Sequence, residues 1–176
     1  MSLFCTDQGL QRLEEKEKKL KEKVRSAGSE VGEAAGINCD WHDNAGYDEA
    51  KKNLEISSRR LQEIREAIST AVVLTLSEQS SLVRIGNTVR VTLVSPDGDE
   101  EEKEFTIGAY GETDIKSRLI AYDSPMAIAL MAQAKGTVLE KVVIGNRVVD
   151  ISIDEILPPS TKYAQLISEF YKKPAE

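Results

Sequence analysis

Two seams of apolar residues run through the first half of the chain and restrict its fold more than any other feature. Residues 7–70 contain no proline, so helices can extend across this stretch. The first seam alternates spacings of three and four residues and comprises Leu10, Leu13, Glu17, Leu20, Val24, Ala27, Val31 and Ala34. The second seam keeps the same spacing and comprises Tyr47, Ala50, Leu54, Ser57, Leu61, Ile64 and Ile68. This heptad pattern predicts two long helices that pack along their length.

The two seams complement each other in one antiparallel register. Ala34 would face Tyr47 near the turn. Leu13 would face Ile68 at the other end. The turn must lie near residues 36–43, where a glycine and an asparagine disfavour helix. We therefore predict that this stretch is an antiparallel coiled-coil hairpin, with arms roughly 40 Å long at ~1.5 Å per residue.

The second half of the chain has the pattern of a small β-rich domain. A linker over residues 71–81, with room for a short strand, precedes a domain over residues 82–157. Alternating and β-branched residues predict strands at 88–94, 103–107, 137–144 and 147–156. Turn residues at 95–98 and 145–146 would connect these strands in pairs as hairpins, so the expected sheet is antiparallel.

One short helix and a tail complete the predicted α+β fold. Ser124 can cap a helix that has Pro125 in its first turn and extends to about Ala132. This helix would pack on the sheet. Residues 158–176 form a tail with apolar residues at helical spacing. We expect a helix over about residues 161–171 that covers apolar surface of its own chain.

Two acidic residues, Asp40 and Asp43, lie in the segment between the predicted helices. One interpretation is structural: Asp40 can cap the second helix, and Asp43 completes a capping-box-like pair. Both carboxylates would also suit the positive end of the helix dipole. The other interpretation is functional, because a long hairpin can carry a chemically active tip to a distant site. The spacing alone does not choose between them.

The tip resembles that of the Gre (GreA/GreB-type) family of bacterial transcription elongation factors, which promote transcript cleavage. In that family an acid, two further residues and a second acid precede Asn-Ala-x-Tyr and the returning helix. Asp40 and Asp43 fall on the two acidic positions. Asn44 and Tyr47 fall on residues that support the tip. The chain departs from the pattern at Asp43, where glutamate is commoner, and at Gly46, where an acid is common.

A second block resembles the C-terminal domain of the same family, which has an FKBP-like fold. It contains the runs Glu112-Thr113-Asp114 and Asp123-Ser124-Pro125-Met126-Ala127. The resemblance extends from about residue 7 to residue 157, and the two motifs occur in the order that the family has. Two separate motifs in the correct order make the resemblance specific.

The resemblance implies a function in transcription and a role for each motif. The hairpin would enter the secondary channel of bacterial RNA polymerase, where the 3′ end of backtracked nascent RNA is extruded. Asp40 and Asp43 would act there as catalytic carboxylates that help hold Mg²⁺ shared with the polymerase. The chain would not be an enzyme itself, because it would complete the hydrolytic site of the polymerase in trans. The polymerase-docking positions would be Asp123, Ser124, Pro125 and Met126.

Composition argues against several other classes of protein. A formal net charge of −7 disfavours strong binding to bare nucleic acid, so contact with nucleic acid should be made through a partner. Two cysteines and one histidine are too few for a disulfide framework or a zinc site. No apolar run approaches the ~18 residues of a membrane span, and no signal peptide is visible. We expect a cytoplasmic monomer without a stably bound cofactor.

Three alternatives remain open. A Gre-like inhibitor would occupy the same channel without productive metal binding, and the altered tip favours this alternative. A peptidyl-prolyl isomerase would follow from an FKBP-like fold, but fold does not fix function. The predicted domain offers only Phe105, Tyr110 and Tyr122 for the aromatic pocket of such an enzyme. A purely structural coiled coil would neither bind polymerase nor depend on the tip residues.

Overall fold

The computed structural model describes residues 2–37 and 45–172. The chain divides into a helical unit that contains Leu10–Val72 and a β-rich unit that contains Phe4–Gly9 and Val73–Glu176. The first unit consists of two helices, and the second is built on a five-stranded sheet. The predicted fold class is therefore confirmed: a helical hairpin is followed by a small, mainly antiparallel β domain with a short helix.

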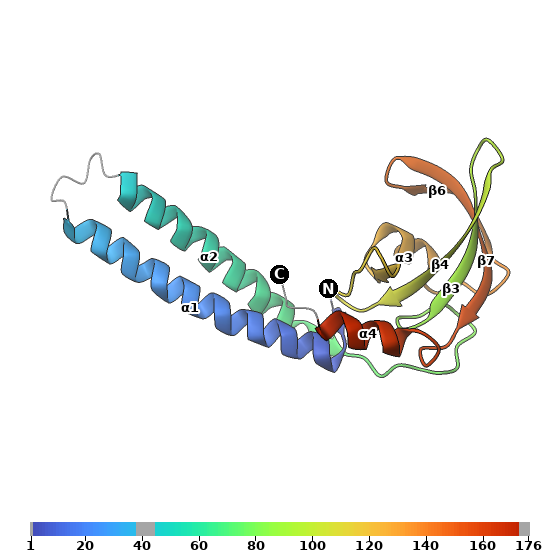
Figure 1. Ribbon diagram of the computed structural model, residues 1–176, viewed down its shortest axis with the longest axis horizontal. Coiled ribbons are helices and arrows are strands. Elements are labelled where there is room, and N and C mark those ends of the chain that lie inside the picture. The colour runs from blue at the N-terminus through green and yellow to red at the C-terminus, as the bar shows by residue number, and fades with distance from the viewer. Residues whose placement is uncertain (1, 38–44, 173–176) are drawn as a thin grey trace. The chain divides into compact units, whose positions relative to one another are not determined.

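The helical unit is the predicted hairpin. Helix α1 spans Asp7–Ile37 and helix α2 spans Ala45–Ser69, and the two lie side by side (Figure 1). Every residue of both predicted seams is buried or half-buried. The most enclosed are Leu13, Ala27, Ala50 and Leu61. Apolar burial along the seams therefore holds the helices together, as their heptad spacing requires.

A charged residue occupies one position of the first seam and is paired there. Glu17 is half-buried, and its Oε1 accepts hydrogen bonds from Lys21 Nζ at 2.8 Å and from Arg65 Nε at 3.1 Å. These bonds, first the one from Lys21, lower the pKa of the Glu17 carboxyl. In the predicted register residue 17 lies opposite Ile64, next to Arg65. The ion pair between the helices therefore confirms that register.

The first helix extends further than the sequence indicated. Helix α1 passes through Gly36 and ends at Ile37, so the prediction that Gly36 interrupts the helix is wrong. One glycine costs a helix only about 1 kcal/mol, which a long helix packed on a partner tolerates. The rest of the predicted turn, and the capping role of Asp40, fall in residues 38–44, outside the described part of the chain.

The sheet of the β-rich unit has the strand order β5-β4-β3-β7-β6. Its strands are β3 (Thr88–Val94), β4 (Glu100–Gly108), β5 (Leu119–Ala121), β6 (Val138–Ile144) and β7 (Arg147–Leu157). Neighbouring strands are antiparallel except β4 and β5, which are parallel. The prediction of a wholly antiparallel sheet is thus wrong at one edge. A strand as short as β5 shows no alternation from which it could be predicted.

Two further short strands form a separate two-stranded sheet. They are β1 (Leu3–Cys5) and β2 (Ala71–Val73). The second lies where the sequence left room for a short strand. The first was not predicted, because three residues at the start of the chain give no periodic signal.

Both predicted hairpin turns are present in the β-rich unit. Gly98 N donates to Ser95 O at 2.9 Å, and Gly98 has a φ of 86°, which glycine adopts without strain. Gly145, between β6 and β7, has a φ of 61°. Strand β4 begins at Glu100, earlier than predicted, because its acidic first residues pair with β3 and keep their side chains exposed.

One face of the sheet forms the main core. Val91 of β3 and Ile151 of β7 are buried there with Leu130 of helix α3, which spans Pro125–Leu130. The helix is two residues shorter than predicted, and Ala132 beyond it has a φ of 61°, which is incompatible with continued helix. The single helix of the predicted fold thus packs on the sheet as expected.

The tail forms a helix on the opposite face. Helix α4 spans Tyr163–Lys172, which confirms the helix predicted for this segment. Tyr163 and Ile167 are buried against Leu119 of β5. The next residue, Ile120, packs in the core on the α3 side. Because successive strand residues point to opposite faces, α3 and α4 cover opposite faces of the sheet.

Two exposed glycines of α1 provide a test of the hairpin. A methyl group added at Gly28 or Gly32 would meet no atom within 4 Å. Because alanine loses less backbone entropy than glycine on helix formation, Gly28→Ala and Gly32→Ala should each stabilise the protein by roughly 0.5–1 kcal/mol. Urea unfolding followed by circular dichroism measures the change. Gly108→Ala is the contrasting control, because its methyl group would lie 2.7 Å from Glu112 O and should destabilise. A loss of stability in either α1 variant would contradict an unstrained helix there.

Candidate functional site

The structure describes one of the two predicted site regions. Asp40, Asp43 and Asn44 of the tip lie outside the described residues. Tyr47, assigned to support of the tip, is half-buried in the first turn of α2. The second region, residues 123–126, is fully described and is called the docking segment from here on.

The docking segment is the start of helix α3. Ser124 is the N-cap and accepts a hydrogen bond from Ala127 N at 3.3 Å, and Pro125 follows as the first helical residue, as the sequence predicted. Asp123 and Pro125 are exposed, whereas Met126 is buried in the core. A cap and a buried anchor therefore hold a carboxylate and a proline ring on the surface, where they can meet a partner.

The residues just before the docking segment are tied to the sheet. Tyr122 N donates to Gly108 O at the end of β4, at 2.9 Å. Ser124 N donates to Ala121 O at the end of β5, also at 2.9 Å. The ring of Tyr122 meets Phe4 edge-on, with 5.7 Å between the ring centroids. The position of the docking segment thus depends on the ends of β4 and β5.

Glu112 is a carboxylate with no exposed surface. Its Oε1 accepts hydrogen bonds from Thr6 Oγ1 and from the hydroxyl of Tyr171, both at 2.8 Å. Its Oε2 accepts from Ala109 N at 2.8 Å and from the hydroxyl of Tyr163 at 2.7 Å. All four partners donate, so both carboxyl oxygens of Glu112 are satisfied within the protein. These five residues are called the Glu112 cluster below.

Sequence reasoning placed Glu112 in a family motif but missed the cluster around it. Its partners are distributed over the N-terminal segment, the end of β4 and both ends of α4. No spacing rule connects positions so far apart in the chain. The available signal was a glutamate that follows Gly111 and precedes a short strand, and this does not distinguish a buried carboxylate from an exposed one.

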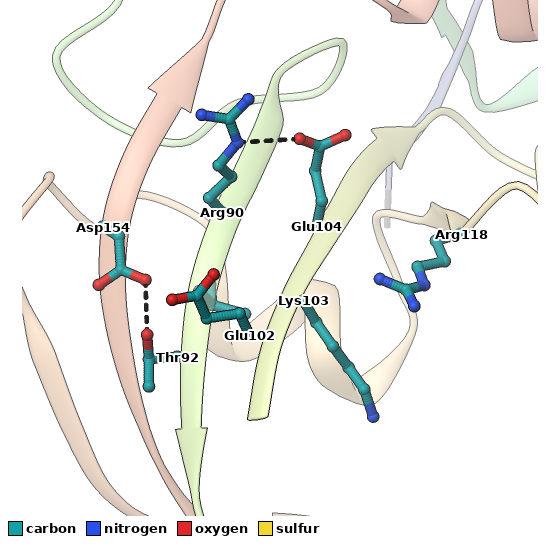
Figure 2. A pocket seen from close by; sticks show the side chains of 8 residues that line it. Arg90, Thr92, Glu102, Lys103, Glu104, Arg118 and Asp154 are labelled. Carbon is teal, nitrogen blue, oxygen red and sulfur yellow. Dashed lines mark hydrogen bonds and ion pairs between the residues drawn. The ribbon is translucent and has the colours of Figure 1, made fainter. Parts of the chain in front are cut away.

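A charged groove of about 490 Å³ lies on the sheet face that also carries α4 (Figure 2). Arg90 Nε donates to Glu104 Oε2 at 3.1 Å, and Arg90 also pairs with Glu155 at 2.6 Å. Thr92 Oγ1 donates to Asp154 Oδ2 at 2.9 Å. The charged residues that line the groove are of both signs: Arg90, Lys103 and Arg118 are cationic, and Glu102, Glu104 and Asp154 are acidic. Its chemistry therefore favours no ligand of one sign, and we assign it none.

An apolar cavity of about 250 Å³ bears on the isomerase alternative. Phe4, Ile85, Tyr122 and Met131 are among its lining residues. Of the three aromatic residues that the alternative requires, only Tyr122 lines this cavity. The aromatic set proposed for an isomerase pocket is therefore not gathered here.

Two further findings concern metals and membranes. Within residues 2–37 and 45–172, no group of three or more His, Cys, Asp or Glu side chains could hold a metal ion. No helix in the same described ranges is both long and apolar enough to cross a bilayer.

Comparison with known proteins identifies the class of protein and then the family. The model of the N-terminal domain of transcription elongation factors matches residues 3–73. The model of the C-terminal domain of GreA/GreB transcription elongation factors matches residues 78–157. The hairpin and the β-rich unit thus each correspond to one half of a transcription elongation factor. The chain belongs to the GreA/GreB family.

Two relatives described as transcription elongation factor GreA agree with this assignment. Transcription elongation factor GreA of Halalkalibacterium halodurans is 33% identical over 144 residues, which cover 81% of this chain and 87% of that protein. GreA of Rickettsia bellii (strain OSU 85-389) is 28% identical over 157 residues, covering 86% and 96%. Among solved structures, GreA factor homolog 1 of Thermus thermophilus matches with a TM-score of 0.41 and 21% identity, covering 89% of this chain and 99% of that one.

The Glu112 cluster makes a prediction about alkaline pH. Burial, and then the adjacent Glu112 carboxylate, raise the pKa of Tyr163 above its ordinary value. The folded state therefore favours the neutral hydroxyl, whose contribution to stability is complete below about pH 10 and is lost as the pH rises further. The melting temperature should fall more steeply above about pH 10 in the wild type than in Tyr163→Phe. Calorimetry across this range measures both slopes, and Tyr110→Phe controls for loss of a hydroxyl outside the cluster. Parallel curves for wild type and Tyr163→Phe would contradict the shift.

Proposed function

We propose that this protein binds bacterial RNA polymerase, inserts the tip of its hairpin through the secondary channel and stimulates Mg²⁺-dependent cleavage of backtracked RNA, which rescues stalled complexes. The family assignment supports the proposal, because both family models match in order along one chain. The structural observation that carries it is the continuous seam of the hairpin. Helices of 31 and 25 residues pack against each other through buried seam residues. Together they form a rod long enough to reach a remote site.

The tip would supply two carboxylates to a site that the polymerase provides. Asp40 and Asp43 offer hard oxygen ligands, which suit Mg²⁺, but two carboxylates alone would not hold the ion tightly. When bound between tip and polymerase, Mg²⁺ would supply charge neutralisation and a water of lowered pKa. Asp40 and Asp43 would orient that water, and Asn44 and Tyr47 would support the tip. The protein would thus act as a cofactor of the polymerase, not as an enzyme by itself.

The docking segment would hold the protein on the polymerase. Its exposed Asp123 suits a basic partner surface, and the exposed ring of Pro125 offers an apolar contact that costs little conformational entropy. Contact with the 3′ end of the nascent RNA would be made only through the polymerase, in keeping with a net charge of −7. The protein would act as a monomer in the cytoplasm.

Substitution of the tip acids separates metal binding from helix capping. Asparagine caps helices about as well as aspartate but lacks the charge that Mg²⁺ requires. Asp40→Asn and Asp43→Asn should therefore each reduce stimulated cleavage at least ~100-fold while leaving polymerase affinity and melting temperature nearly unchanged. Cleavage of RNA in backtracked complexes, with and without the protein, is the measurement. Full cleavage by both variants would contradict the metal hypothesis and favour the capping interpretation.

The same assay distinguishes an activator from an inhibitor. Asp43→Glu restores the residue that is commoner in the family and extends the carboxylate by one methylene. If the wild type stimulates cleavage, the activator proposal stands. If the wild type only blocks the polymerase and Asp43→Glu gains cleavage, the natural protein is an inhibitor that occupies the same channel.

Charge reversal in the docking segment tests how the protein is held. Asp123 is exposed, so Asp123→Arg should leave the fold intact. Juxtaposed like charges at an interface cost several kcal/mol, so the affinity for RNA polymerase should fall about 10-fold or more. Competition binding against labelled wild type measures the change, with Asp97→Arg in the β3–β4 turn as a matched reversal at another exposed acid. Equal affinity of the Asp123 variant and the wild type would remove this segment from the interface.

A further inference from the structure

Helix α4 is an addition to the two domains that define the family. The matched spans end at residue 157, whereas α4 covers Tyr163–Lys172. The helix is nevertheless fastened to the β-rich unit at several points. Lys162, just before it, pairs with Glu104 of β4 at 2.5 Å. The apolar side of the helix is buried against Leu119 of β5.

Helix α4 is also attached to the Glu112 carboxylate. Tyr163 and Tyr171, near the two ends of the helix, provide two of the four hydrogen bonds that Glu112 accepts from described residues. These two bonds are 2.7 and 2.8 Å long, and because hydrogen bonds are directional they fix the position of the helix, which apolar contact alone does not do. Without α4 the buried carboxylate would keep only the donors of Thr6 and Ala109.

Two routes lead from α4 to the docking segment. The first runs through Glu112. Its backbone oxygen lies so close to Gly108 that a methyl group on Gly108 would be 2.7 Å from it. Gly108 O in turn accepts from Tyr122 N, immediately before the docking segment. The second runs through Leu119, which α4 covers, and along β5 to Ala121 O, which accepts from Ser124 N.

We infer that α4, acting through Glu112 and β5, fixes the position of the docking segment, so that Glu112, Tyr163 and Tyr171 are positioning residues for partner binding. The inference rests on the proposed docking function. None of the three residues touches the partner. They hold the ends of β4 and β5, which present Asp123 and Pro125 to a basic partner surface. The C-terminal tail is thereby part of the polymerase-binding apparatus of this chain.

Hydrogen exchange tests the positioning step without the polymerase. The variants are the double substitution Tyr163→Phe/Tyr171→Phe and, separately, Glu112→Gln, and Tyr110→Phe is the control outside the cluster. The amides of Tyr122 and Ser124 should exchange about fivefold faster in both variants, because their attachment loosens locally. The amides of the β3–β7 pair should not change. Uniform acceleration throughout the unit would indicate lost stability alone and overturn the inference, as would unchanged exchange at both amides.

Polymerase affinity tests the functional step at a temperature where every variant is folded. Both cluster variants should bind about fivefold more weakly, and combining them should weaken binding by less than the product of the separate effects, because they break one shared linkage. Val149→Ala, a core variant of β7, serves as a control for general destabilisation and should bind like the wild type.

Asp123→Arg, measured in parallel, separates the two hypotheses. If it weakens binding and the cluster variants do not, the positioning inference is wrong and the docking function stands. If Asp123→Arg has no effect, the docking function is wrong, and the claim that the cluster positions a binding segment falls with it. Hydrogen exchange still decides in that case whether α4 holds residues 122–124. Faster exchange at Tyr122 and Ser124 together with weaker binding of both cluster variants supports the inference.

Discussion

A carboxyl group without exposed surface must find all its hydrogen-bond partners within the protein, and Glu112 imposes this demand on the β-rich unit. The unit meets it only when Thr6, the end of β4 and helix α4 come together. Tyr163 and Tyr171 can reach the same carboxylate because eight residues are a little over two helical turns, so both lie on one side of α4. One side chain thus connects Thr6 and helix α4 to the end of β4.

The hairpin obeys a different constraint, since its stability comes from repeated apolar contacts instead of one buried charge. Seam residues of both helices are buried or half-buried throughout the described arms. Contacts between the two helices thus recur at every turn of the heptad pattern. In the proposed function, the helical arm would reach the remote site and the β-rich unit would provide the attachment, and each corresponds to one of the two family domains that match the chain.

Much of the architecture could be predicted from the sequence because it depends on local patterns. Heptad spacing predicted the hairpin and its register. Alternation predicted β3 with the bounds that the structure has, and Ser124 with Pro125 predicted the start of α3. The features that were missed depend on contacts distant in sequence. Strand β5 is too short to show a pattern, and the donors of Glu112 become neighbours only through folding. For the tip acids, Asp40 and Asp43, the proposed roles come from the resemblance, because an aspartate before a helix suits both a cap and a metal ligand.

The ion pair between Glu17 and Arg65 restricts how the two helices of the hairpin can align along each other. Apolar seam residues are interchangeable from one heptad to the next, so burial alone would permit α2 to slide along α1 by seven residues. That slip would move Arg65 about 10 Å from Glu17 and leave a half-buried carboxylate without its partner across the seam. One charge among apolar residues therefore disfavours the shifted alignments, by the modest amount that a partly exposed ion pair contributes. The ion pair thereby sets which residues of α1 and α2 lie opposite each other, and this alignment defines the length of the hairpin.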